Sequence, residues 1–239
     1  MSYRLLNRSL QPALLIFSNV IFSCRGILFD LDGVLVDSTG AVARVWRRWA
    51  QKHGLPAKLV IQTAHGRRSI ETIRLLTPHL GAESENRIVE AMEIADQEGV
   101  AALPGAAELL RAVPPDRYSI VTSATRALAT ARMSHAGLPL PRLSVTADDV
   151  REGKPSPQPY LKGAALLGLA PGDCMVFEDT PAGVESAHRA GMRSIALTTT
   201  FPKNELDAAN AIVASLADVR ATIEPRCIHL DVKEAGKES

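Results

Sequence analysis

The sequence predicts an α/β protein: a doubly wound parallel sheet with a helical cap inserted after the first strand of that sheet. Short apolar runs alternate with longer segments of helical periodicity, a pattern typical of βαβ units. The runs are apolar at every position rather than at every second one, as expected for strands buried on both faces. One long interval of purely helical pattern separates the first run from the second, and it predicts the insertion.

Six apolar or β-branched runs are the expected strands: Gly26–Phe29, Tyr118–Val121, Leu143–Thr146, Cys174–Phe177, Ser194–Leu197 and Ala211–Ala214. Helices are expected between them at Thr125–His135, Tyr160–Leu167 and Pro181–Ala190, each followed closely by a glycine. Thr180 and Pro181 have the residue types that favour the N-cap and the first position of a helix.

The helical interval predicts a cap over residues 40–103, with amphipathic helices at Ala41–His53, Ser69–Leu76 and Ser84–Glu98. The turn Leu103-Pro104-Gly105 returns the chain to the core. We therefore expect an apolar extension over residues 1–23, an α/β core over residues 24–39 and 104–239, and the cap between the two core segments. A cap beside the carboxyl ends of the strands can act as a lid.

Composition excludes several classes of protein. The 239 residues carry a net charge of +1, which argues against a partner such as nucleic acid or an acidic membrane surface. Three cysteines without a CxxC pair fit a reducing compartment. The apolar run Ala13–Ser23 follows Arg4 and Arg8 but is shorter than the roughly 20 residues that span a bilayer. A secretory leader, a tail packed on the domain and a mis-assigned start all remain open for it; we expect a cytoplasmic protein, with a monomer favoured.

Two expected strands end in pairs of acidic residues: Asp30 and Asp32 follow the first, and Glu178 and Asp179 end the fourth. Ligands of open α/β sheets bind at the carboxyl ends of the strands, so these carboxylates are expected to meet there. Their repulsion favours a hard cation such as Mg²⁺, which takes carboxylate and phosphate oxygens. The alternative is that the acids serve only in turns and at a helix N-terminus.

Two further strand ends add groups that suit an anion. Thr122 and Ser123 follow the second strand and provide hydroxyls at an open helix N-terminus. Lys154 lies in the loop after the third strand, and its ammonium group can hold a phosphate. A lone lysine in a loop is ordinarily a solvated surface residue, so the expectation depends on the other groups around it.

Together these segments resemble the haloacid dehalogenase superfamily of phosphatases. Four motifs occur in the family's order: Asp30-Leu-Asp-Gly-Val-Leu-Val-Asp37-Ser38, Thr122-Ser-Ala-Thr-Arg126, Gly153-Lys-Pro155 and Glu178-Asp-Thr-Pro-Ala-Gly183. The resemblance covers Arg25 to about Phe201. Within the superfamily, the sequence looks most like the bacterial broad-specificity sugar-phosphate phosphatases, followed by the yeast-type glycerol-phosphate and deoxyglucose-phosphate phosphatases.

The resemblance implies a Mg²⁺-dependent phosphatase that acts on small phosphorylated metabolites through an aspartyl-phosphate intermediate. Asp30 would be the nucleophile and Asp32 the general acid and base. Ser123, the N–H of Ala124 and Lys154 would hold the phosphoryl oxygens. The metal set would be Asp30, Asp32 (through its carbonyl oxygen), Glu178 and Asp179. In the cap, Arg67 and Arg68 are candidates for substrate binding, with a solvated helix start as the alternative for each.

Two features bear on the reaction. Dehalogenases of the superfamily lack an acid two residues after the nucleophile, so Asp32 favours phosphoryl transfer. The phosphoglucomutase branch carries a histidine twelve residues after the nucleophile, where this chain has Val42, so water is the expected acceptor. The alternatives are a phosphosugar mutase, a phosphoglycolate-type phosphatase, and a non-hydrolytic phosphoacceptor or regulatory protein.

Overall fold

The computed structural model describes residues 19–234, so most of the apolar run at the start of the chain lies outside the described residues. Its centre is a six-stranded sheet with the order β6-β5-β2-β7-β8-β9, and all of its strand pairings are parallel. The strands are β2 (Gly26–Phe29), β5 (Tyr118–Val121), β6 (Ser144–Val145), β7 (Cys174–Glu178), β8 (Arg193–Leu197) and β9 (Ala211–Val213). The predicted fold class is confirmed.

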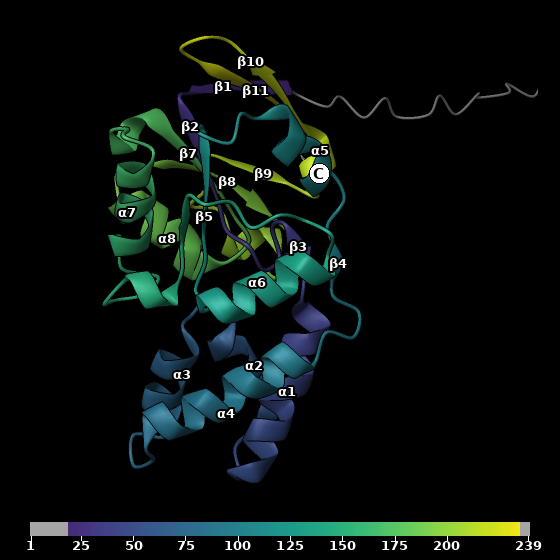
Figure 1. Ribbon diagram of the computed structural model, residues 1–239, viewed down its shortest axis with the longest axis vertical. Coiled ribbons are helices and arrows are strands. Elements are labelled where there is room, and N and C mark those ends of the chain that lie inside the picture. The colour runs from purple at the N-terminus through teal and green to yellow at the C-terminus, as the bar shows by residue number, and fades with distance from the viewer. Residues whose placement is uncertain (1–18, 235–239) are drawn as a thin grey trace, which may run out of the picture.

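Helices cover both faces of this sheet (Figure 1). One face packs against α7 (Gln158–Leu166) and α8 (Pro181–Arg189), where Leu28 and Val176 meet Tyr160 and Ala187. The other face packs against α5 (Ala106–Ala112) and α6 (Arg126–His135). The central strands are therefore buried on both sides, which explains why their sequences are apolar at every position.

A second, antiparallel sheet lies beside the parallel one and was not predicted. It has the order β1-β11-β10, formed by Asn19–Cys24, Ile228–Lys233 and Val219–Ile223. The central strand β11 alternates buried and half-buried residues, and Ile228, Leu230 and Val232 join the main hydrophobic core. The boundary expected at residue 23 therefore falls inside β1, a strand that pairs along its whole length with β11.

Four helices form the cap: α1 (Thr39–Lys52), α2 (Ala57–Ala64), α3 (Ser69–Leu76) and α4 (Ala82–Ala95). The chain enters and leaves it through a short antiparallel pair, β3 (Val36–Asp37) with β4 (Ala101–Ala102). Val45, Trp46, Trp49 and Ile73 lie in a hydrophobic core of the cap's own. The two tryptophans are thus packing residues, and α2 is a helix that the sequence analysis did not predict. Figure 1 shows the cap below the sheet, with α4 next to α6.

No helix among residues 19–234 has both the length and the hydropathy needed to cross a bilayer. Cys24, Cys174 and Cys227 are all free thiols.

The return of the chain from cap to core depends on Gly105, which has a φ of +85°. A Cβ atom there would lie 2.3 Å from the backbone nitrogen of Ala217, whereas one at Gly99, with a φ of +75°, would meet nothing within 4 Å. We expect Gly99→Ala to lower the free energy of unfolding by about 1 kcal/mol, the cost of the left-handed conformation. Gly105→Ala should lower it by about 3 kcal/mol or more, because it adds a backbone collision. Urea unfolding measures both, and equal losses would contradict this account.

Candidate active site

Asp30 lies at the carboxyl end of β2, the strand between β5 and β7 near the middle of the sheet. Its backbone N–H donates to the carbonyl of Phe177 at 2.9 Å, which continues the pairing of β2 with β7 and buries the side chain. The turn after Asp30 needs a glycine at position 33, which has a φ of +81°. A Cβ at Gly33 would lie 1.9 Å from Oδ2 of Asp179, so only glycine allows the two strand ends to approach.

Lys154 is the cation of the site, and it is almost fully buried. Its Nζ donates to Oδ1 of Asp30 at 2.5 Å, to Oε1 of Glu178 at 2.6 Å and to the carbonyl of Val121 at 3.1 Å. Burial disfavours the charged ammonium, but the carboxylates of Asp30 and Glu178 raise the pKa of Lys154 above its ordinary value. The lysine therefore stays protonated between the two acids.

Glu178 is the anchor of that lysine. Its Oε1 also accepts the hydroxyl of Tyr160 at 2.8 Å, and its Oε2 accepts the N–H of Asp179, the N–H of Thr180 and the Thr180 hydroxyl. Burial opposes ionisation, but the ammonium of Lys154 and these donors lower the pKa of Glu178 below its ordinary value. Both oxygens are thus already engaged. A Cβ at Gly183 would lie 1.8 Å from Oε1, so a glycine is required against this carboxylate.

Asp179 is the acid that lacks a partner. Both of its carboxylate oxygens are buried and have no hydrogen-bond partner among residues 19–234. Burial, then the carboxylates of Glu178 and Asp30, raise the pKa of Asp179 well above its ordinary value. Burial likewise raises the pKa of Asp30 to about 7, although Lys154 opposes the shift.

These acids fit a divalent cation. Ligand atoms of Asp30, Glu178 and Asp179 lie within 4.8 Å of one another. Within residues 19–234, Lys154 is the only cationic side chain that pairs with these acids, and the unpartnered oxygens of Asp179 are the kind of hard ligand that Mg²⁺ takes. Asp30 and Asp179 are better placed to bind it than Glu178, whose oxygens already accept five hydrogen bonds.

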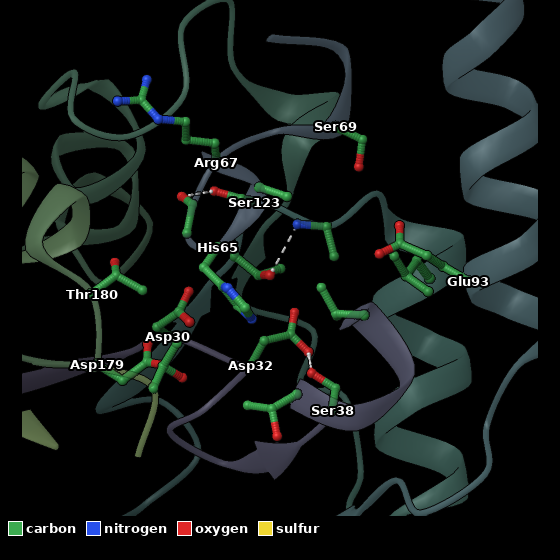
Figure 2. Close-up of a pocket in the computed structure, with 18 of the residues that line it drawn as sticks. Asp30, Asp32, Ser38, His65, Arg67, Ser69, Glu93, Ser123, Asp179 and Thr180 are labelled. Atoms are coloured by element: carbon green, nitrogen blue, oxygen red, sulfur yellow. Dashed lines mark hydrogen bonds between the residues drawn. The ribbon is translucent and has the colours of Figure 1, made fainter. Parts of the chain in front are cut away.

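Asp30 and Asp32 line one cavity at this edge of the sheet (Figure 2). Asp32 is held there by residues that were not among the predicted site residues. The hydroxyl of Ser38 donates to its Oδ1 at 2.6 Å, and Nη1 of Arg132 donates to its Oδ2 at 2.6 Å. Arg132 lies in the last turn of α6 and was not identified from the sequence, since a single arginine within a helical pattern carries no motif.

The loop after β5 meets the cap. The hydroxyl of Ser123 donates to the carbonyl of Gly66 at 2.9 Å, and the N–H of Ala124 donates to the hydroxyl of Thr122 at 3.1 Å. Both groups line the cavity, but in this structure they bond to protein atoms. The cavity has a volume of about 60 Å³, far below the roughly 300–1,000 Å³ of pockets for drug-sized ligands. The cap therefore contacts the core at the site and leaves little room there.

The two cap arginines differ in position. Arg67 lines the cavity, but Figure 2 shows its guanidinium pointing away from Asp30 and Asp32. Nη1 of Arg68 donates to the carbonyl of Arg151 at 2.8 Å and pairs with Glu71, so this side chain ties the cap to the loop that carries Lys154. His65, in the same cap segment, also lines the cavity, and its buried Nε2 has no hydrogen-bond partner among the described residues. Burial lowers the pKa of His65.

A parallel sheet with convergent acids and a lysine at its carboxyl edge, covered by a helical cap, defines a capped α/β enzyme. The comparisons with known proteins agree with this class. The model of the haloacid dehalogenase-like hydrolases matches residues 27–197, and the chain belongs to that family. The family and the enzyme predicted from the sequence are thus confirmed.

Individual relatives are similar over most of the chain. Hexitol phosphatase A of Escherichia coli (strain K12) is 42% identical over 212 residues, which cover 84% of this chain and 96% of that protein. Glycerol-1-phosphate phosphohydrolase 2 of Saccharomyces cerevisiae is 36% identical over 186 residues, covering 73% of this chain and 74% of that protein. Among solved structures, a hydrolase from Pseudomonas syringae has a TM-score of 0.73 at 26% identity, covering 81% of this chain and 95% of that chain.

The charge balance of the site predicts the effect of Lys154→Met. This change keeps the length of the side chain but leaves Asp30 and Glu178 buried without their counter-ion, so we expect it to lower the free energy of unfolding in EDTA by about 3–5 kcal/mol. Lys162→Met on α7 is the matched control, because Lys162 is 42% exposed and makes an ion pair of 3.9 Å; it should cost less than about 1 kcal/mol. Similar losses for the two variants, measured by urea unfolding, would show that Lys154 does not balance the acids.

Proposed function

We propose that the protein is a Mg²⁺-dependent phosphatase that hydrolyses small sugar or polyol phosphate monoesters through an aspartyl-phosphate on Asp30. One observation carries the proposal: Asp30 lies between a buried ammonium, Lys154, and a buried carboxylate without a partner, Asp179. The bound cation would be held by Asp30, the carbonyl of Asp32 and Asp179, and it would offset the repulsion between the nucleophile and the phosphoryl oxygens.

The residues divide the chemistry between them. A carboxylate oxygen of Asp30 forms a bond to phosphorus while the bond from phosphorus to the leaving oxygen breaks. Asp32 gives its proton to that leaving oxygen and later takes a proton from the water that hydrolyses the aspartyl-phosphate. Lys154 neutralises charge on Asp30 and on the phosphoryl oxygens. Ser123 and the N–H of Ala124 can bind the same oxygens once the hydrogen bonds to Gly66 and Thr122 are exchanged for substrate.

Two further points support hydrolysis of a small substrate. Val42 lines the cavity at the position where the mutase branch carries a histidine, so no imidazole at this position can serve transfer between sugar hydroxyls. The similar proteins named above are phosphatases of hexitol and glycerol phosphates, and we propose the same substrate class here. We propose Glu178 as the residue that positions Lys154, and Arg67 as the cap residue that turns toward the substrate. The reducing compartment favoured by the free thiols makes the cytoplasm the proposed location.

The first test is a panel of hexitol, glycerol, hexose and glycolate phosphates assayed by kcat/KM with the wild type and with Asp30→Asn. We expect turnover of the polyol and sugar esters by the wild type and a loss of at least about 10⁴-fold in the variant, because the nucleophile is gone at nearly constant size. Residual turnover in Asp30→Asn at the wild-type level would refute the nucleophile. A preference for glycolate phosphate would replace the substrate class by the phosphoglycolate type.

A second test follows metal binding without activity. Burial raises the pKa of Asp30 from 3.8 to about 7, so the folded metal-free protein binds more protons than the unfolded chain between these values, and its stability falls as pH rises through them. Mg²⁺ competes with those protons, so the rise in Tm on adding Mg²⁺ should be larger at about pH 8 than at about pH 5. In Asp179→Asn the rise at high pH should shrink. The metal site would be contradicted by an equal rise in Tm at the two pH values, or by a rise in Asp179→Asn as large as that of the wild type.

A further inference from the structure

A buried arginine outside the four motifs joins Asp32 to the cap. Arg132 lies on α6 of the core, and its Nη1 donates to Oδ2 of Asp32 at 2.6 Å. Its Nη2 donates to Oε1 of Glu93 at 3.2 Å, and Glu93 belongs to α4 of the cap. The side chains of Arg132 and Glu93 are 4% and 5% exposed. One guanidinium thus bridges an acid of the core and an acid of the cap.

The bridge fixes the orientation of Asp32. Ser38 holds Oδ1 and Arg132 holds Oδ2, so both oxygens of the carboxylate have a donor. The side chain of Asp32 nevertheless remains 27% exposed and lines the cavity, so it stays within reach of a substrate. Arg132 itself cannot give a proton, because a guanidinium stays charged in proteins. Arg132 can therefore affect proton transfer only through another group, and the acid of the core that it contacts is Asp32.

The link to the cap has a specific geometry. Glu93 and Glu90, one turn apart on α4, both contact the core: Glu90 accepts the hydroxyl of Thr125 at 2.5 Å, and Thr125 is the N-cap of α6. The cap is therefore docked on the helix that carries Arg132, and Figure 2 shows Glu93 on the far side of the cavity from Asp30. When α4 moves away, Arg132 loses one of its two carboxylates.

We propose that Arg132 is a positioning residue that places the carboxyl group of Asp32 for proton transfer to the leaving oxygen, and that Glu93 makes this placement depend on cap closure. The inference rests on the proposed function, in which Asp30 forms the bond to phosphorus and the electron pair of the broken phosphorus–oxygen bond takes the proton of Asp32. It adds a residue in the wall of the same cavity that holds Asp32 and that couples the lid to the chemistry.

The test compares two leaving groups. An alkoxide such as that of glycerol phosphate needs a proton to leave, whereas p-nitrophenolate leaves without one. Because kcat/KM reports the steps up to departure of the leaving group, it excludes the later attack of water. Loss of positioning in Arg132→Met should lower kcat/KM for glycerol phosphate by about 100-fold and for p-nitrophenyl phosphate by less than about 5-fold.

Three further variants make the result specific. Arg132→Lys keeps the charge but loses the planar fork that reaches both carboxylates. We expect it to lower kcat/KM for glycerol phosphate selectively, by about 10-fold. This variant replaces Arg132→Met if the latter does not fold. Glu93→Gln should lower the ratio of kcat/KM for glycerol phosphate to kcat/KM for p-nitrophenyl phosphate, but by a smaller factor than Arg132→Met. Arg44→Met is the control: Arg44 makes a two-point ion pair with Asp96 within the cap segment and does not line the cavity, so the ratio should stay at the wild-type value.

The outcomes separate the two proposals. If Asp30→Asn still hydrolyses both esters, the proposed function is wrong and the role of Arg132 is wrong with it. If Asp30→Asn is inactive but Arg132→Met and Arg132→Lys lower both kcat/KM values by the same factor, Arg132 is a structural residue and only this inference fails. An unchanged ratio of the two kcat/KM values in Glu93→Gln would show that the placement of Asp32 does not depend on the cap.

Discussion

The architecture of the site depends on one electrostatic constraint: three buried acids share one buried ammonium at the end of the sheet. Two of the acids, Asp30 and Glu178, contact Lys154, while Asp179 has no donor among the described residues. Charges buried without compensation are costly, so the arrangement is stable with its carboxylates ionised only if a cation completes it. A cation bound here would thus be part of the charge balance of this site as well as of the proposed chemistry.

The fold meets this constraint by bringing strand ends very close together. Asp30 directly follows β2 and Glu178 is the last residue of β7, the hydrogen-bonded neighbour of β2, so their separation is set by the spacing of a parallel sheet. Gly33 and Gly183 remove the Cβ atoms that would collide with Asp179 and Glu178. Tyr160 then supplies a hydroxyl from α7, and Asp179 and Thr180, directly before α8, supply two backbone N–H groups and a hydroxyl. The result is a carboxylate, Glu178, that is fixed at both oxygens and holds Lys154 against Asp30.

How much the sequence could predict depended on whether a signal is local. Strands buried on both faces are continuous apolar runs, so β2 and β5 were predicted with their observed bounds. Strands β1, β10 and β11 alternate because one face is exposed, and the first was read as part of an apolar extension. Motif residues were found because their spacing is short. Arg132 could not be found, since its partners lie 100 and 39 positions away: the fold of the core brings Asp32 to it, and the docking of α4 on α6 brings Glu93.

The seam between cap and core is polar, and this bears on how substrate enters. Water can replace the hydrogen bonds across the seam when the two surfaces separate. These bonds join Ser123 to Gly66, Arg68 to Arg151 and Thr125 to Glu90. The cap keeps its own apolar core around Trp46 and Trp49, so opening need not expose a large hydrophobic face. The Arg132–Glu93 ion pair in this seam is almost fully buried, and separating the surfaces exposes its two charges to solvent rather than leaving them unpaired in protein. The cavity of about 60 Å³ leaves little room for a substrate of the proposed class, so we expect the cap to move during turnover. A seam of exchangeable hydrogen bonds around one buried ion pair allows that opening while restoring a single closed geometry around Asp32.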